Sequence, residues 1–143
     1  PVFVGVGGGI TGGDRSIRLA IEAENQGAFG VVVNAPISDE VISRIKEVVD
    51  IPVIATIVSD RMDIRSRIEA GADFLNISGA SATPQIVRSI RAQFPDVPIL
   101  ATGGPNDETI LATIRAGANA ITYSPPSNGE LFADIMQKYR GRL

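Results

Sequence analysis

Short apolar runs alternate with amphipathic segments along the chain, repeating at intervals of about two dozen residues. Each run is rich in β-branched residues and is nearly continuous, which is typical of parallel strands that are buried on both faces. The pattern predicts six strands, over residues 2–6, 30–34, 52–58, 74–78, 98–102 and 120–124.

The segments between these runs carry the start signals of helices. Ser38 stands before apolar residues at helical spacing, and the pair Thr83-Pro84 predicts an N-cap followed by proline at the first helical position. Asn106 is followed by two acids, which the positive end of a helix dipole favours. A further helix is expected to begin at Asp14.

Three glycines mark the ends of helices. Gly27, Gly71 and Gly117 each fall just before a predicted strand, where glycine can adopt the left-handed conformation that ends a helix. Regular alternation of strands and helices predicts an α/β protein with a parallel sheet and right-handed crossovers. We treat residues 1–143 as a single domain of this kind.

Six units can belong either to an open, doubly wound sheet or to a (β/α)₈ barrel of the TIM type, which closes with eight strands. An unclosed parallel sheet leaves two edges to cover. If the chain is a barrel, we expect a partial one whose gap is filled by missing residues or by a partner subunit. The need to cover the edges also predicts a homo-oligomer. The amphipathic residues 131–139 are expected to pack over one edge.

Composition narrows the chemistry. The chain has no cysteine and no histidine, which removes thiolate zinc sites, cysteine nucleophiles and the commonest general base, so no metal site is expected. The net charge of −3 argues against a nucleic-acid partner. The sequence contains no apolar run long enough for a membrane span, and the expected location is the cytoplasm.

The C-terminal half carries a resemblance to known proteins. Residues 94–106 read FPDVPILATGGPN, which is similar to the seventh strand of 2-keto-3-deoxy-6-phosphogluconate aldolases. The match is at the level of the phosphate-binding (β/α)₈ barrel superfamily. On this alignment, the six predicted strands correspond to strands three to eight of the barrel, and the first two βα units are missing.

This resemblance implies a phosphate site. In those barrels the turn after strand seven, here Thr102-Gly103-Gly104 with Asn106 following, binds substrate phosphate. Tyr123 and Ser124 fall where the eighth strand ends in a second phosphate turn. Glycine would let backbone N–H groups approach the anion at a helix N-terminus, whereas a tight turn without a ligand is the simpler alternative.

The chain departs from the aldolases at the position of the catalytic lysine. Asn76 lies near the place where those enzymes form a Schiff base, and the two lysines, Lys46 and Lys138, belong to predicted helices. Schiff-base chemistry is therefore not expected from this polypeptide.

The remaining candidates lie at the ends of the predicted strands. Asp14 and Asp60 are weak catalytic candidates alongside Asn76, although an acid at a helix N-terminus has the same sequence signature. Asn34 and Ser78 are polar groups that suit ligand binding rather than proton abstraction.

The opening of the chain is rich in glycine and contains a formal G-x-G-x-x-G at Gly7, Gly9 and Gly12. A dinucleotide fold is disfavoured because glycine is costly in the first turns of a helix and because Asn34 replaces the acid that would hold a ribose. The barrel interpretation makes this segment a loop over the mouth of the site, from which Arg15 could reach an anion. A surface loop without a ligand is the alternative.

Two classes of function remain open. The first is a lyase, isomerase or hydrolase of phosphorylated sugars or keto acids. The second is a sensor that binds such a metabolite without converting it, as in glycerol-operon antiterminator regulators. FMN-binding barrels share the same motifs, which makes FMN a candidate cofactor.

Overall fold

A computed structural model describes residues 1–9, 12–104, 106–123 and 126–141 of the chain. The six predicted strands are all present, each within a residue or two of its predicted limits. Their bounds are β1 Phe3–Gly5, β2 Gly30–Val33, β3 Val53–Ile57, β4 Phe74–Ile77, β5 Ile99–Thr102 and β6 Ala120–Thr122.

Helices follow the strands in alternation. Their bounds are α1 Asp14–Asn25, α2 Asp39–Val48, α3 Ile64–Glu69, α4 Thr83–Gln93, α5 Asp107–Arg115 and α6 Asn128–Arg140, and a 3₁₀ turn, η2 Ala80–Ala82, precedes α4. Helices α2 and α5 begin where the sequence signals predicted, with Ser38 and Asn106 as their N-caps. The prediction for Thr83 was wrong, because Thr83 is the first helical residue and its Oγ1 accepts a hydrogen bond from the Gly79 N–H at 3.0 Å.

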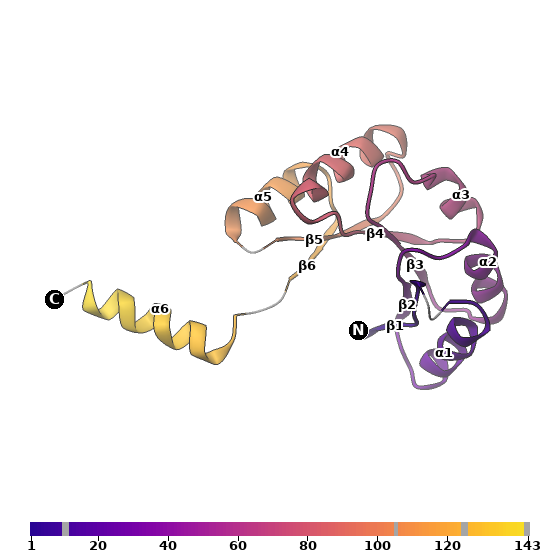
Figure 1. The fold of residues 1–143 in the computed structure, drawn as a ribbon, viewed down its shortest axis with the longest axis horizontal. Helices are drawn as coiled ribbons and strands as arrows, with labels where there is room; N and C mark the ends of the chain where they lie inside the picture. The colour runs from indigo at the N-terminus through magenta and orange to yellow at the C-terminus, as the bar shows by residue number, and fades with distance from the viewer. Residues whose placement is uncertain (10–11, 105, 124–125, 142–143) are drawn as a thin grey trace.

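The strands are parallel and lie in sequential order from β1 to β6. In a doubly wound sheet the strand order would reverse near the middle, so this order excludes that alternative. Figure 1 shows the sheet curled, with helices α1 to α5 forming an arc on its convex side. The fold is thus a half-barrel of the TIM type, as the α/β repeat predicted.

The main core lies between the sheet and this arc of helices. Alternate strand residues such as Val31, Leu75 and Ile99 are fully buried against apolar helix residues that include Ile45 and Ile90. Burying one such side chain stabilises the fold by roughly 1.5–3 kcal/mol. The same alternation turns the other strand residues toward the concave side of the sheet.

A repeated turn joins three of the helices, α1, α3 and α5, to the strands that follow them, at the amino ends of those strands. The predicted left-handed glycines are confirmed, with φ of 80° at Gly27, 109° at Gly71 and 110° at Gly117. Asp73, two residues after Gly71, accepts hydrogen bonds from the Val53 N–H at 2.8 Å and from Lys46 Nζ at 2.7 Å.

Asn119 repeats the arrangement two residues after Gly117. Its Oδ1 accepts hydrogen bonds from the Ile99 N–H at 2.9 Å and from Arg91 Nη2 at 2.7 Å. The sequence showed the glycine repeat but not the role of the polar residue that follows it. These contacts lie at the amino ends of the strands, the end of a barrel that contributes to stability, and opposite the carboxyl ends where active sites form.

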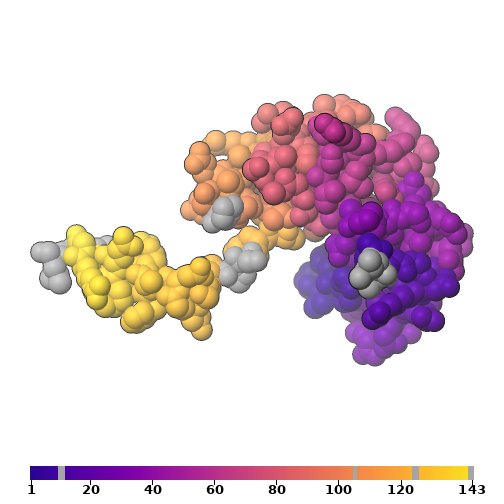
Figure 2. All heavy atoms as spheres, viewed as in Figure 1, coloured from indigo at the N-terminus to yellow at the C-terminus, as the bar shows by residue number. Residues whose placement is uncertain are grey.

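Helix α6 stands apart from the rest of the chain (Figure 2). The expectation that residues 131–139 pack over a sheet edge is not met, because none of the residues of α6 is buried. Its start is nevertheless well formed: the Ser127 N–H and hydroxyl donate hydrogen bonds to Glu130, and they hold the pKa of that carboxyl below its usual value. No helix in the described part of the chain is long and apolar enough to cross a membrane.

Candidate functional site

The concave face of the sheet becomes more polar toward the carboxyl ends of the strands. A first row of side chains, in register across β2, β3 and β4, is apolar: Val32, Ile54 and Phe74. Two residues further along, the next row is Asn34, Thr56 and Asn76. Active sites of barrel proteins form at this end of the strands, which makes it the place to look for a ligand site.

The polar row is held together by hydrogen bonds between side chains. Asn76 Nδ2 donates to Thr56 Oγ1 at 3.2 Å, and Thr56 Oγ1 donates to Asn34 Oδ1 at 3.4 Å. Thr56 is 7% exposed, whereas Asn76 is half-buried and Asn34 is exposed. The structure therefore brings together two of the predicted site residues, Asn34 and Asn76, through Thr56, which the sequence analysis missed.

A pocket of about 410 Å³ lies between α4 and α5, at the carboxyl end of β5. It includes Thr102, Gly103 and Gly104 of the predicted phosphate turn. The other lining residues come from the segment before α4 and from the two helices: Ala80, Ser81, Thr83, Pro84, Thr109 and Thr113. Because it includes the turn that the resemblance names, this pocket is the candidate for the expected phosphate site.

Three of the five hydroxyl groups in this pocket are engaged within the protein. Thr83 Oγ1 accepts from Gly79, Thr109 Oγ1 donates to the Asn106 carbonyl at 2.8 Å, and Thr113 Oγ1 donates to the Thr109 carbonyl at 2.9 Å. The hydroxyls of Ser81 and Thr102 have no hydrogen-bond partner among the described residues. These two groups are therefore open to a ligand.

The glycine pair has a reason within the protein itself. A Cβ at Gly103 would lie 2.5 Å from Ile121 Cγ2, and one at Gly104 would lie 2.5 Å from Thr109 Oγ1. Gly104 also has a φ of 83°, which side chains disfavour. Packing against α5 and β6 thus explains both glycines without a ligand.

The N–H groups of Gly103 and Gly104 differ in whether they are free to bind a ligand. The Gly103 N–H donates to the Thr122 carbonyl at 2.9 Å and is occupied by the sheet. The Gly104 N–H has no partner among the residues that the structure describes. Of the predicted turn, Gly104 and the Thr102 hydroxyl are therefore the groups that remain for an anion.

The two helix N-termini at the pocket carry different charges. Helix α4 has no acid in its first turn and no capping side chain, so its positive dipole end is not compensated. Helix α5 has Asp107 and Glu108 in its first turn and is capped by Asn106, whose Oδ1 accepts from the Thr109 N–H at 2.9 Å. The α4 end attracts an anion, whereas the acids of α5 oppose one.

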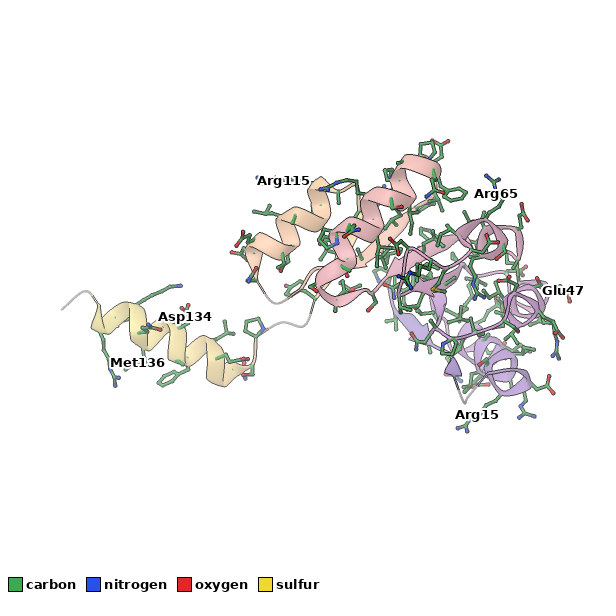
Figure 3. The ribbon with its side chains drawn as sticks, turned by 45° about the horizontal axis from the view of Figure 1, so that its top comes forward. Arg15, Glu47, Arg65, Arg115, Asp134 and Met136 are labelled. Atoms are coloured by element: carbon green, nitrogen blue, oxygen red, sulfur yellow. The ribbon has the colours of Figure 1, made fainter. Side chains whose placement is uncertain are left out.

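Arg15 and Asp14 lie far from this pocket along the sheet. They belong to the first turn of α1, which follows β1, whereas the pocket follows β5. Figure 3 shows Arg15 projecting outward from the start of α1. Asp14 is exposed and pairs with Arg44 at 2.7 Å, so it acts as the helix N-terminal acid that the sequence analysis gave as the alternative.

The other predicted residues are also dispersed. Asp60 lines a separate groove of about 330 Å³ near α3 and α4, with Asp63 and Arg65. Ser78, half-buried, extends β4 by one residue, and its N–H donates to the Ile57 carbonyl at 2.9 Å. Tyr123 is 63% exposed after β6, and Ser124 lies outside the described residues.

A second pocket at the same end of the sheet adjoins the glycine-rich opening. It has a volume of about 440 Å³ and is lined by Gly9, Gly12, Gly13, Pro36, Ile37, Ser38 and Val41. The opening is fixed to β2 and the following loop, because the Asn34 N–H donates to the Gly7 carbonyl and the Gly9 N–H to the Pro36 carbonyl. Acids begin both adjoining helices, α1 and α2, so this pocket suits an anion less well.

Lysine is absent from the carboxyl ends of the strands. Lys46 pairs with Asp73 at the opposite end of the sheet, and Lys138 pairs with Asp134 within α6. Among the described residues no group of three or more His, Cys, Asp or Glu side chains is arranged to hold a metal ion. The described part of the site thus contains neither a Schiff-base lysine nor a cluster of metal ligands.

Comparison with known proteins finds a protein of similar sequence and solved structures of similar fold. No family model matches it. It is 28% identical over 124 residues to a thiamine-phosphate synthase of Geobacillus thermodenitrificans (strain NG80-2), a match that covers 79% of this chain and 53% of that protein. The chain therefore spans about half the length of the curated relative that it matches.

Two solved structures show the same fold. A proposed phosphonomutase from Burkholderia cenocepacia J2315 superimposes with a TM-score of 0.66 and 18% identity, over 99% of this chain and 67% of that one. A cube-shaped, highly porous protein cage, designed by fusing symmetric oligomeric domains, gives a TM-score of 0.63 and 24% identity over 78% of this chain and 41% of that one. Strand order, curvature and these likenesses identify the chain as a six-unit half-barrel of the TIM-barrel type.

Proposed function

We propose that this protein binds the phosphate group of a phosphorylated metabolite in the pocket between α4 and α5. The observation that carries the proposal is the N-terminus of α4, which has neither an acid nor a capping side chain and which faces a pocket of about 410 Å³. Helix N-termini favour anions through their N–H groups and their dipole. The names of the thiamine-phosphate synthase and the phosphonomutase support a phosphorus-containing ligand.

Uncharged groups would hold the phosphate. The Gly104 N–H and the hydroxyls of Ser81 and Thr102 are donors in the pocket that have no partner among the described residues. Hydrogen bonds to an anion are stronger than those between neutral groups, which increases the contribution of each of these donors. Among the described residues, no lysine or arginine side chain lines this pocket, and the dipole of α4 supplies the positive potential instead.

The lack of titratable groups favours binding over turnover. The concave positions of the six strands, read from the strand pairing, carry no Asp, Glu or Lys in the described residues. Asp, Glu and Lys are, with histidine, the side chains that most often carry out general acid–base catalysis, and they must lie within hydrogen-bonding reach of the substrate. A sensor of a phosphorylated metabolite therefore fits the described site better than a lyase, isomerase or hydrolase.

Calorimetric titration with inorganic phosphate, using the wild-type chain and the double variant Ser81→Ala/Thr102→Val, tests the proposal. Removing both open hydroxyls should weaken phosphate binding by about tenfold or more. Ser89→Ala is the matched control, because Ser89 lies on α4 but lines the groove on its other side. Equal affinities for all three proteins would overturn the site, and FMN serves as a further ligand in the same assay.

A further inference from the structure

The row Asn34, Thr56 and Asn76 has the properties of a second binding subsite. Thr56 and Asn76 are paired on β3 and β4, Asn34 directly follows β2, and hydrogen bonds of 3.2 and 3.4 Å join the three side chains. Groups on strands that hold one another in this way are already oriented before a ligand arrives.

The hydrogen bonds within the row decide which atoms remain for a ligand. Thr56 uses its one O–H donor toward Asn34 and accepts from Asn76. The Nδ2 group of Asn34, the Oδ1 atom of Asn76 and the second N–H of Asn76 Nδ2 have no partner among the described residues. Asn34 therefore offers a ligand neutral N–H donors, and Asn76 offers one donor and one acceptor. Hydroxyl groups, which both donate and accept hydrogen bonds, can pair with this combination.

The distance to the phosphate pocket is short. Asn76 on β4 is paired with Leu100 on β5, and Thr102 lies two residues further along β5. With a rise of about 3.3 Å per residue and a strand spacing of about 4.8 Å, the row and the turn are on the order of 8 Å apart. A molecule of three to six carbon atoms can place its phosphate in the pocket and its other groups on the row.

Charge decides the chemical class of that molecule. The concave positions of the described strands carry no charged side chain, and neither do the residues that line the pocket. A carboxylate placed there would lose hydration without gaining a cation. This inference rests on the proposed function. We propose that Asn34, Thr56 and Asn76 bind the hydroxyl groups of a phosphorylated, otherwise uncharged polyol. The site should therefore reject phosphorylated carboxylic acids.

A matched pair of ligands tests this proposal. Glycerol 3-phosphate and 3-phosphoglycerate have the same three-carbon chain and one phosphate, but one ends in a hydroxymethyl group and the other in a carboxylate. Calorimetry should show that glycerol 3-phosphate binds about tenfold more tightly than 3-phosphoglycerate and also more tightly than inorganic phosphate.

Variants of the row locate the effect. Asn76→Leu keeps a similar volume but removes both polar atoms, so it should abolish the advantage of glycerol 3-phosphate and leave the affinity for inorganic phosphate unchanged. Asn25→Leu, on the exposed last turn of α1, is the matched control. Asn34→Ala, at an exposed position, gives the same test if Asn76→Leu does not fold.

The outcomes separate the two proposals. If inorganic phosphate binds but neither three-carbon ligand binds more tightly, the subsite is wrong and the phosphate pocket stands. If 3-phosphoglycerate binds as tightly as glycerol 3-phosphate, the uncharged class is wrong. If no phosphate compound binds, the proposed function fails, and the subsite proposal fails with it.

Discussion

Asp73 and Asn119 hold the same position in two βα units, each two residues after the glycine that ends the preceding helix. Asp73 accepts a hydrogen bond from the Val53 N–H at 2.8 Å, and Asn119 accepts one from the Ile99 N–H at 2.9 Å. Each also meets a long cationic side chain, Lys46 or Arg91. Since a carboxylate and an amide both serve, the position requires an acceptor oxygen rather than a negative charge.

This equivalence predicts the effect of substitutions at position 73. Asp73→Asn should cost little stability, because the amide oxygen still accepts from Val53. Asp73→Ala should lower the free energy of unfolding by about 1–3 kcal/mol, since the Val53 N–H loses its acceptor and Lys46 loses its partner. Urea denaturation measures both values, and equal stability of the Ala and Asn variants would contradict the account.

Much of the fold could be predicted from the sequence because its signals are local. Apolar runs gave all six strands, and left-handed glycines such as Gly71 marked the helix ends. Position 83 was misjudged because Thr83 and Pro84 have the sequence signature of an N-cap and its following residue. The 3₁₀ turn Ala80–Ala82 leads directly into α4, and the Thr83 hydroxyl accepts from the Gly79 N–H rather than capping the helix.

Ala80 has an unusual backbone conformation beside the proposed phosphate pocket. Its φ is 50°, in the left-handed region that side chains disfavour. Ala80→Gly relieves this strain but increases the conformational entropy of the unfolded chain. The free energy of unfolding should therefore stay unchanged or rise by roughly 0.5 kcal/mol. Ala112→Gly, within α5, should instead cost about 1 kcal/mol. Thermal denaturation compares the two, and a similar loss in both would show that Ala80 is not strained.

The acids of α5 should weaken phosphate binding. Asp107 and Glu108 stand in the first turn of the helix, where a carboxylate repels an anion that enters the pocket. Replacing both by Asn and Gln should raise the affinity for inorganic phosphate by roughly two- to tenfold, most clearly at low salt. Calorimetry at two salt concentrations measures this. Unchanged or reduced affinity would place the anion elsewhere.

The exposed apolar face of α6 predicts self-association. Phe132 is 65% exposed, Ile135 51% and Tyr139 69%, and none of them packs against the described half-barrel. We expect an oligomer in light scattering after gel filtration. Ile135→Glu should dissociate it, whereas Asp134→Ala, on the same helix, should not. A wild-type protein that elutes as a monomer of 15.0 kDa would refute this prediction.

The candidate site was less accessible to sequence reasoning than the fold. The turn at Thr102 was found through a resemblance, but its glycines turned out to be needed for packing against Ile121 and Thr109. Thr56 was missed because it lies inside a run of apolar residues. Only the register of β3 with its neighbours shows that its side chain joins Asn34 and Asn76.

Nuclear magnetic resonance of the ¹⁵N-labelled protein tests the central claim most directly. Titration with inorganic phosphate should shift the amide signals of Ser81 and Gly104 in a saturable way, because these residues belong to the pocket between α4 and α5. The signals of Gly13 and Ser38, in the other pocket, should stay in place. Saturable shifts confined to Gly13 and Ser38, or no saturable shift at all, would contradict the proposed phosphate site.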